Sequence, residues 1–365
     1  MSAKLLVPAM LAGLLAGCGT FGTHPAGHDF IVTAAKPGQL FVVDPRKMKV
    51  VSDFTIPDAH DSVSTIVTSP DGRIAYVLVN RARSIAGIDL RTGQQVFRAN
   101  LSSPGLRVQC MAFDVTPDGK TLIVYEYRTH LGIDAYTVKP PRFAIYSTAA
   151  GAFAMPVRTF PAPRRIQAVL ASKNGRSFYA LWPKAYQFDL QTGRLLGERG
   201  IEHWGRKDHS SADLSINSPA SEPTGIYVAP VYSTVTGAGL PAGGVPATSL
   251  MTLNLHTGKL AFHDISRTAP PIFATILSPS HHWAFGVFDA LFKINARRWN
   301  IDKQVPVPHS FYMVNISSDG KQIYLGGNMC DIAVYDARTL RQRGDIKLPG
   351  CGDQALVTPR IIERP

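Results

Sequence analysis

The stretch from residue 317 to 350 shows most plainly how apolar and polar positions alternate along this chain. Three short β-prone runs, at 322–325, 332–335 and 345–348, are separated by polar segments that contain Asn, Asp and Gly. Short runs rich in β-branched and aromatic residues are typical of strands, and no helical periodicity passes through them. Ser318-Asp319-Gly320 is a tight-turn sequence, because Asp can bond its own backbone and Gly accepts a positive φ. The stretch therefore predicts a unit of short antiparallel strands joined by tight turns.

The turn that closes the third run of this unit recurs along the chain. Asp or Asn begins most copies, and Gly supplies the positive φ in several of them. Seven copies are found, at Asp44-Pro45-Arg46, Asp89-Leu90-Arg91-Thr92-Gly93, Ser147-Thr148, Asp189-Leu190-Gln191-Thr192-Gly193, Asn254-Leu255-His256-Thr257-Gly258, Asn295-Ala296-Arg297 and Asp336-Ala337-Arg338.

These copies are spaced by roughly 40 to 65 residues, and a period near 40 to 45 residues with several strands is the signature of a propeller blade. A second turn, between the first and second strands of a unit, supports the count. It occurs at Ser69-Pro70-Asp71-Gly72, Thr116-Pro117-Asp118-Gly119, Ser172-Lys173-Asn174-Gly175, Ser278-Pro279-Ser280-His281 and Ser317-Ser318-Asp319-Gly320, and it is degenerate near Ser221-Glu222-Pro223-Thr224. We predict an all-β chain folded as a seven-bladed β-propeller.

The two ends of the repeat array complement each other. The first unit lacks its innermost strand, and one strand too many follows the seventh unit, near residues 355–362. Giving this C-terminal strand to the first, N-terminal blade closes the ring and removes the open edges of the array. Longer intervals mark insertions at 128–141, 203–221 and 233–248, which we expect on the faces of the propeller, where loops shape binding surfaces unless they have merely drifted.

The N-terminal residues read as an export signal. A short basic segment precedes an apolar run at 5–17, which is too short to span a bilayer but suits a secretory signal. Leu15-Ala16-Gly17-Cys18 resembles a bacterial lipobox, so residues 1–18 are interpreted as a lipoprotein-type signal peptide with Cys18 as the lipidation site. An ordinary signal peptide with an incidental Cys18 is the alternative. Residues 19–27 then form a tether, 28–365 form a single propeller domain, and the location is periplasmic with a lipid anchor to a membrane.

Three further cysteines remain. Cys330 and Cys351 flank the last hairpin, and an exported compartment permits a disulfide between them; two unpaired buried thiols are the alternative. Cys110 lies in an apolar run and is expected in the core.

The net charge of +12 does not by itself indicate a nucleic-acid partner. Lys and Arg are spread over turn positions, with no long basic run and no aromatic interleaving, so no nucleic acid is expected. An acidic partner subunit or an anionic membrane surface fits an exported basic protein better.

No enzyme motif is present. The sequence has no G-x-S-x-G, H-E-x-x-H, Walker or dinucleotide fingerprint, and no C-x-x-C-H for a c-type haem. The histidines are scattered, and the aspartates sit at turns. We therefore expect no catalytic, cofactor or metal residues in this chain.

One segment combines several chemical groups. His309, Ser310, Phe311 and Tyr312 lie in the connection between the sixth and seventh blades, which reaches one face near the axis. A contact with a partner or with a substrate cavity is one interpretation, and packing between neighbouring blades is the other.

The chain resembles the β subunit of quinohaemoprotein amine dehydrogenase over nearly its whole length after the tether. The resemblance rests on His28-Asp29-Phe30-Ile31-Val32, Gly72-Arg73-Ile74-Ala75-Tyr76, Thr116-Pro117-Asp118-Gly119-Lys120-Thr121-Leu122, Pro308-His309-Ser310-Phe311-Tyr312-Met313-Val314-Asn315-Ile316-Ser317-Ser318-Asp319-Gly320, Leu325-Gly326-Gly327 and Leu348-Pro349-Gly350. The lipobox and the cysteine pair Cys330 and Cys351 are departures from the family pattern.

The resemblance implies a non-catalytic propeller in a three-subunit periplasmic enzyme that oxidises primary amines. A dihaem cytochrome c α subunit and a small γ subunit with a cysteine tryptophylquinone would be the partners, and this chain would scaffold the small subunit and help wall the substrate cavity. The alternatives are a freestanding exported propeller that binds a ligand or an envelope protein, and a propeller lactonase, which needs carboxylates and histidines converging on the channel.

Overall fold

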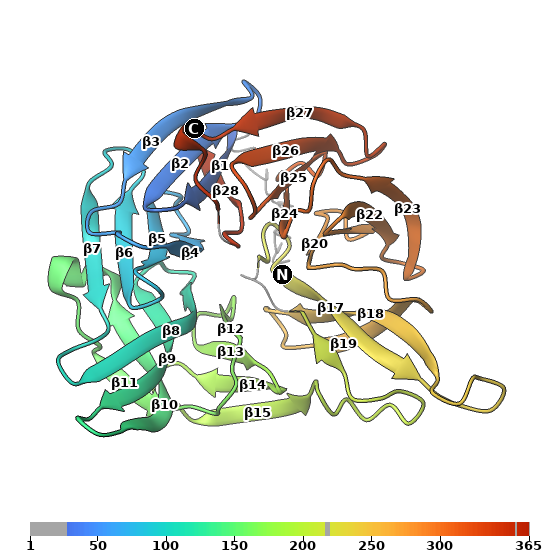
Figure 1. The fold of residues 1–365 in the computed structure, drawn as a ribbon, viewed down its shortest axis with the longest axis horizontal. Coiled ribbons are helices and arrows are strands. Elements are labelled where there is room, and N and C mark those ends of the chain that lie inside the picture. Colours follow the sequence, from blue (N-terminus) through green and yellow to red (C-terminus); the bar gives the residue numbers. More distant parts are fainter. Residues whose placement is uncertain (1–27, 216–219, 355, 365) are drawn as a thin grey trace, which may run out of the picture.

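The computed structural model describes residues 28–215, 220–354 and 356–364, and the strands of these residues form seven four-stranded antiparallel sheets arranged in a ring (Figure 1). The prediction of an all-β, seven-bladed propeller is confirmed.

Each blade runs from an inner strand at the axis to an outer strand at the rim. Blades 1 to 3 are β28, β1, β2 and β3 (Arg360–Arg364, His28–Ala35, Gln39–Asp44, Lys49–Thr55), β4 to β7 (Val63–Thr68, Ile74–Val79, Ser84–Asp89, Gln95–Asn100), and β8 to β11 (Leu106–Val115, Thr121–Leu131, Tyr136–Ser147, Arg158–Pro161). Blades 4 and 5 are β12 to β15 (Ala168–Ala171, Ser177–Leu181, Lys184–Asp189, Leu195–Gly200) and β16 to β19 (Asp213–Leu214, Ile226–Val235, Val245–Asn254, Leu260–Ser266). Blades 6 and 7 are β20 to β23 (Ala274–Leu277, Trp283–Val287, Ala290–Asn295, Asn300–Pro306) and β24 to β27 (Met313–Ile316, Gln322–Gly326, Asp331–Asp336, Gln342–Lys347). Two short 3₁₀ helices, η1 (Thr148–Phe153) and η2 (Pro349–Cys351), lie in connections.

Position in the blade determines the burial pattern of a strand. The third strands β6 and β26 are buried at nearly every residue, whereas the outer strand β3 alternates between exposed and half-buried residues. A middle strand is covered on both faces by the neighbouring blades, which explains its continuous apolar sequence; an outer strand keeps one face in water.

The recurring Asp and Asn side chains close the turns, as the sequence predicted. In blade 2, Asp89 Oδ1 accepts hydrogen bonds from the backbone N–H groups of Arg91 at 2.9 Å and Thr92 at 3.0 Å. Asn254 makes the equivalent pair of bonds in blade 5, at 2.9 and 3.0 Å. A neutral amide side chain therefore makes the same pair of bonds as a carboxylate here.

The ring closes as predicted, by a strand from the C-terminal end. β28 pairs antiparallel with β1, with His28 opposite Arg364 and Val32 opposite Arg360. Ile362 is buried in one core cluster with Val32 and Ile66, so the last strand packs between blades 1 and 2. This strand begins at Arg360, later than the predicted 355.

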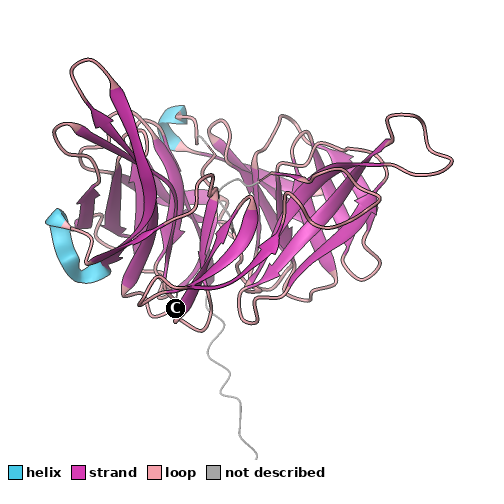
Figure 2. Cartoon of the chain, turned by 90° about the horizontal axis from the view of Figure 1, so that it is seen from below, coloured by secondary structure: helices cyan, strands magenta, loops and turns pink. Residues whose placement is uncertain are grey.

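The two ends of the ring differ in character (Figure 2). We call one end the turn face: it carries the short turns between first and second strands (69–73, 116–120) and between third and fourth strands (89–94, 189–194). His28 and Arg364 also lie there. The opposite end, the loop face, carries the connections between blades (101–106, 201–212, 307–312) and the loop at 236–244.

Two of the predicted insertions extend hairpins: 128–141 is mostly strand, and 233–248 contributes the ends of two strands around the loop at 236–244. β9 and β10 form one long hairpin with a bulge between Lys139 and Arg142, and β17 and β18 pair from Ile226 to Val235 without interruption. The extra residues thus lengthen hairpins on the loop face.

The signal peptide, Cys18 and the tether lie outside the described residues. Within those residues, no helix is long and apolar enough to cross a membrane.

We predict that a chain ending at Pro359 is strongly destabilised. The truncation removes buried Ile362 and leaves the inner edge of β1 unpaired. Loss of one large buried side chain alone costs about 2–5 kcal/mol, so thermal unfolding of the truncated chain should begin well below that of the full chain. Glu363→Gln, at an exposed position of the same strand, is the control. An unchanged Tm in the truncated chain would show that β28 does not hold the ring closed.

Candidate functional site

The segment singled out from sequence, 309–312, lies on the loop face between β23 and β24. His309 Nε2 lies 3.1 and 3.0 Å from the two carboxylate oxygens of Asp331, and its Nδ1 lies 3.0 Å from the carbonyl oxygen of Ser310. Asp331 is buried and also pairs with Lys347 at 3.2 Å. The His309 ring is therefore held at a fixed position while part of its surface stays exposed.

The two aromatic residues of this segment have different surroundings. Phe311 is completely buried in the core cluster between blades 6 and 7, so it packs between blades. Tyr312 is half-buried, and its ring stacks on Phe273 and Phe288 at centroid distances of 5.1 and 5.8 Å. Phe273 and Phe288 themselves stack at 4.6 Å. We call Phe273, Phe288 and Tyr312 the aromatic stack; the structure assembles it from three separate connections on the loop face.

A disulfide joins Cys330 and Cys351 beside this region, with their Cα atoms 4.6 Å apart. The bridge fixes the segment that leads from β27 to the closing strand. In that segment Gln354 is buried; its side chain donates to the Asp331 carbonyl at 2.8 Å and accepts from Thr33 Oγ1 at 2.9 Å. Blade 7 is thereby tied to blade 1. Cys110 is buried and unpaired, and burial raises the pKa of its thiol, which makes it an unreactive core residue.

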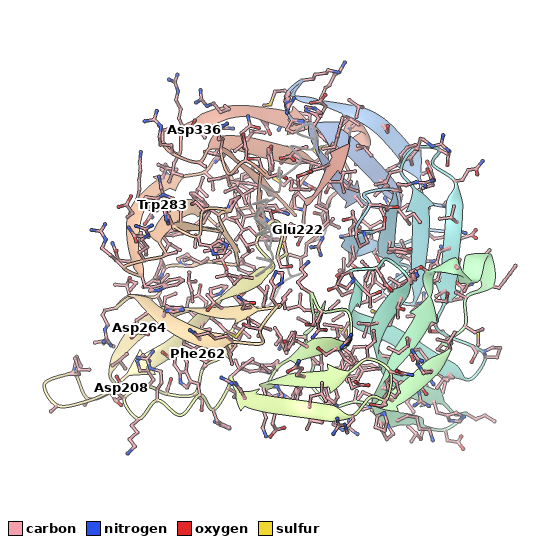
Figure 3. The ribbon with its side chains drawn as sticks, turned by 180° about the vertical axis from the view of Figure 1, so that it is seen from behind. Asp208, Glu222, Phe262, Asp264, Trp283 and Asp336 are labelled. Carbon is pink, nitrogen blue, oxygen red and sulfur yellow. A yellow bond between two sulfur atoms is a disulfide. The ribbon has the colours of Figure 1, made fainter. Side chains whose placement is uncertain are left out.

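A hollow of about 890 Å³ opens at the centre of the turn face. The inner-strand turns of several blades line it, and Figure 3 shows Glu222 near the axis of the ring. Arg360 is buried at its base, where Nη1 donates to both carboxylate oxygens of Glu222 at 3.1 and 3.4 Å and Nε donates to the Ile66 carbonyl at 2.7 Å. Blades 1, 2 and 5 are thus linked through one guanidinium group.

Asp114 shares the base of this hollow. Its carboxylate accepts from the backbone N–H groups of Val115 and Ala171, both at 2.8 Å. Burial raises the pKa of Asp114 to about 6, and the N–H donors and the charges of Arg360 and Lys173 only partly oppose this effect. Arg360 and Asp114 also line a much smaller cavity of about 30 Å³. The two side chains therefore lie between two neighbouring spaces inside the ring.

A second polar cluster lies in blade 5, toward the rim (Figure 3). Arg206 forms a two-pronged ion pair with Asp264, at 2.5 and 2.8 Å, and its guanidinium lies 5.0 Å from the Trp204 ring centre. This pairing lowers the pKa of Asp264 to about 2. His209 Nδ1 lies 2.9 Å from Ser233 Oγ, and His209 Nε2 is buried without a hydrogen bond. The cluster connects the 201–212 connection to the β17–β18 hairpin.

No group of three His, Cys, Asp or Glu side chains within the described residues is arranged to hold a metal ion. His203 and His209, which share one connection, therefore do not complete a metal site with described neighbours. His281 and His282 are exposed on a turn.

Comparison with known proteins supports the fold. No protein-family model matches the chain, and no curated protein matches it in sequence. Among solved structures, hydrazine synthase from Kuenenia stuttgartiensis aligns with a TM-score of 0.56 at 15% identity, covering 91% of this chain and 99% of that one. The dihydro-haem d1 dehydrogenase NirN aligns with a TM-score of 0.55 at 15% identity, covering 89% and 74% of the two chains. A protein of unknown function from Desulfotomaculum acetoxidans aligns with a TM-score of 0.59 at 11% identity, covering 93% and 100%. At these identities the likeness shows a shared propeller fold alone.

We predict that replacing both Cys330 and Cys351 with Ser lowers the stability of the ring. A bridge across a separation of 21 residues removes conformational freedom from the unfolded chain and contributes about 3 kcal/mol. Thermal unfolding with and without reductant measures the effect. The reduced wild type should match the double variant, and the variant should not respond to reductant. A wild type indifferent to reductant would contradict the stabilising role.

We also predict a specific pH dependence from Asp114. The pKa of this carboxyl is about 6 in the folded chain and near 3.8 in the unfolded chain, so its ionisation penalises folding as pH rises from 4 to 6. The free energy of unfolding of the wild type, minus that of Asp114→Asn, should fall by an amount on the order of 2 kcal/mol between pH 4 and 7. Urea unfolding at each pH measures this difference.

Asp118→Asn is the matched control for this measurement. The Thr116 hydroxyl and the turn N–H groups hold the pKa of Asp118 below its usual value, so the corresponding difference should rise with pH. If the difference in free energy of unfolding between wild type and variant changed with pH in the same way for both variants, the assignment of the raised pKa to Asp114 would be refuted.

Proposed function

We propose that this chain is a non-catalytic propeller subunit of a periplasmic oxidoreductase, namely the β subunit of a quinohaemoprotein amine dehydrogenase. The shared propeller fold is compatible with this role, and the ordered sequence resemblance that centres on 308–320 supports it. The observation that carries the proposal is the arrangement on the loop face, where His309 is held by Asp331 next to the half-exposed aromatic stack.

In this proposal the loop face docks the small γ subunit. Tyr312 and Phe288 would supply a rigid apolar contact, and His309 with Ser310 would supply hydrogen bonds at its edge. Rigid aromatic anchors beside fixed polar groups are the usual centre of a protein interface. The γ subunit would carry the cysteine tryptophylquinone and the α subunit the two c-type haems, while this chain would shape the amine cavity and orient the substrate.

The proposed location is the periplasm, with the chain anchored to a membrane through a lipid on Cys18. The disulfide between Cys330 and Cys351 is compatible with export, because such bonds persist in oxidising compartments.

One observation favours a second candidate, a freestanding exported propeller that binds a ligand. The hollow of about 890 Å³ on the turn face is large enough for a small molecule, and Lys173, Glu222 and Arg360 lie along it. No comparable observation among the described residues favours a propeller lactonase.

We predict that this chain, tagged and purified from its host, brings with it c-type haem absorbance and amine-dependent dye reduction. Tyr312→Ser should lower the amine-dependent dye reduction recovered per chain about fivefold or more, because the quinone-bearing γ subunit is proposed to dock there and loss of an aromatic anchor costs about 1–4 kcal/mol of binding. Leu195→Ala, at an exposed position of the outer strand of blade 4, is the control and should leave recovery unchanged. Recovery of the wild-type chain without haem and without dye reduction would refute the subunit proposal.

A further inference from the structure

An apolar loop joins β10 to β11 of blade 3 at the rim of the turn face and packs beside β7 of blade 2. Residues 148–157 contain no charged side chain, and Phe153, Met155 and Val157 are 91%, 71% and 60% exposed. The backbone of the loop is nevertheless fixed: Thr148 Oγ1 donates to the Gly119 carbonyl at 2.8 Å, and the Ala154 N–H donates to the Arg98 carbonyl at 2.9 Å. Large apolar side chains held in water by an ordered backbone mark an interaction surface.

Exposed cations accompany this loop around the same face. The carboxylates of the turns between third and fourth strands are directed inward, as Asp89 shows by its bonds to turn N–H groups. Asp71, Asp118 and Asp319, in the turns between first and second strands, are exposed, and Asp319 pairs with Lys321. Exposed basic side chains outnumber them around this face. Several of these exposed cations form no ion pair with any described residue; they are Arg46, Arg91, Lys120, Arg158, Arg176, Arg194, Lys259, Arg338 and Arg341.

The described chain also begins on this face. His28 pairs with Arg364 at the turn-face end of blade 1, and the residues before it include the apolar run at 5–17 and Cys18. Ten residues span at most about 35 Å. An acyl group on Cys18 would therefore keep the turn face within that distance of a bilayer.

We propose that the turn face lies against an anionic phospholipid surface, with Phe153 and Met155 in the headgroup region and Arg91, Lys120 and Arg158 over lipid phosphates. The proposal rests on the lipid anchor proposed for Cys18 and goes beyond it, because it assigns an orientation and a second contact. A lipid surface fits better than a protein partner, since the loop offers only one side-chain hydroxyl, at Thr148, while its flanks carry dispersed cations. An acyl chain combined with a basic, apolar surface is a recognised route to stable attachment.

The test uses the full mature chain on lipid vesicles, with an environment-sensitive fluorophore on Phe153→Cys. Cys110 is buried and Cys330 is bonded to Cys351, so the introduced thiol is the accessible one in a lipidated chain. The matched control is Ile133→Cys, which is 103% exposed at the tip of the β9–β10 hairpin on the loop face. Vesicles of phosphatidylcholine alone are compared with vesicles containing phosphatidylglycerol.

We expect the fluorescence emission of the probe at position 153 to shift to shorter wavelength on vesicles that contain phosphatidylglycerol. The shift should be several-fold smaller on phosphatidylcholine alone, and the difference between the two lipids should disappear at high salt. The probe at position 133 should not respond. An emission shift at position 133, with or without one at 153, overturns the proposed orientation. The absence of a shift at both positions also overturns it, and so does a chain that fails to bind vesicles. An equal response at 153 on both lipids overturns the role of the cations. Met155→Cys repeats the test at a second position. The result is independent of haem recovery, so failure of this proposal and failure of the subunit proposal are distinguishable.

Discussion

Closure of the ring is the constraint on which the rest of the structure depends. Each blade buries both of its faces against neighbours, so an open array would leave two large apolar faces in water. The chain closes this gap with the backbone pairing of β28 and β1, the packing of Ile362, and the buried side chains of Gln354 and Arg360. The disulfide adds a covalent link just before the closing strand. Residues near both ends of the described chain, such as Ile31 and Ile362, are therefore buried.

The closed ring constrains the length of the connections differently on its two faces. On the turn face, most turns reverse the chain within a few residues, with the repeated Asp or Asn and, in several blades, a residue with positive φ such as Gly93. The longer 148–157 connection of blade 3 is an exception. On the loop face, a connection only has to reach the next blade, so its length can vary without disturbing the sheets. The long β9–β10 and β17–β18 hairpins and the aromatic stack all occur where this freedom exists.

The sequence was sufficient for the fold because the turn chemistry is local. Asp89 and Asn254 close their turns with neighbouring N–H groups, and these residues mark the blades without any knowledge of distant contacts. The site was only partly predictable. Residues 309–312 were identified, but the complete burial of Phe311 and the partial exposure of Tyr312 depend on contacts with residues of blade 6. The partners Phe273 and Phe288 are distant in sequence, and the bond between Arg360 and Glu222 joins residues 138 positions apart. No local pattern encodes such contacts.

The positions of the hollow and the aromatic stack limit which functions can share one face. The hollow is lined mainly by turns and strand ends of the turn face, whereas the aromatic stack is built from connections of the loop face. A substrate cavity shared with a partner on the loop face would therefore be built from the connections around the aromatic stack, independently of the hollow. If the turn face meets a bilayer, the hollow opens toward lipid and the aromatic stack points away from it. The proposed membrane contact and the proposed partner contact are thus compatible, because the ring places them on opposite faces.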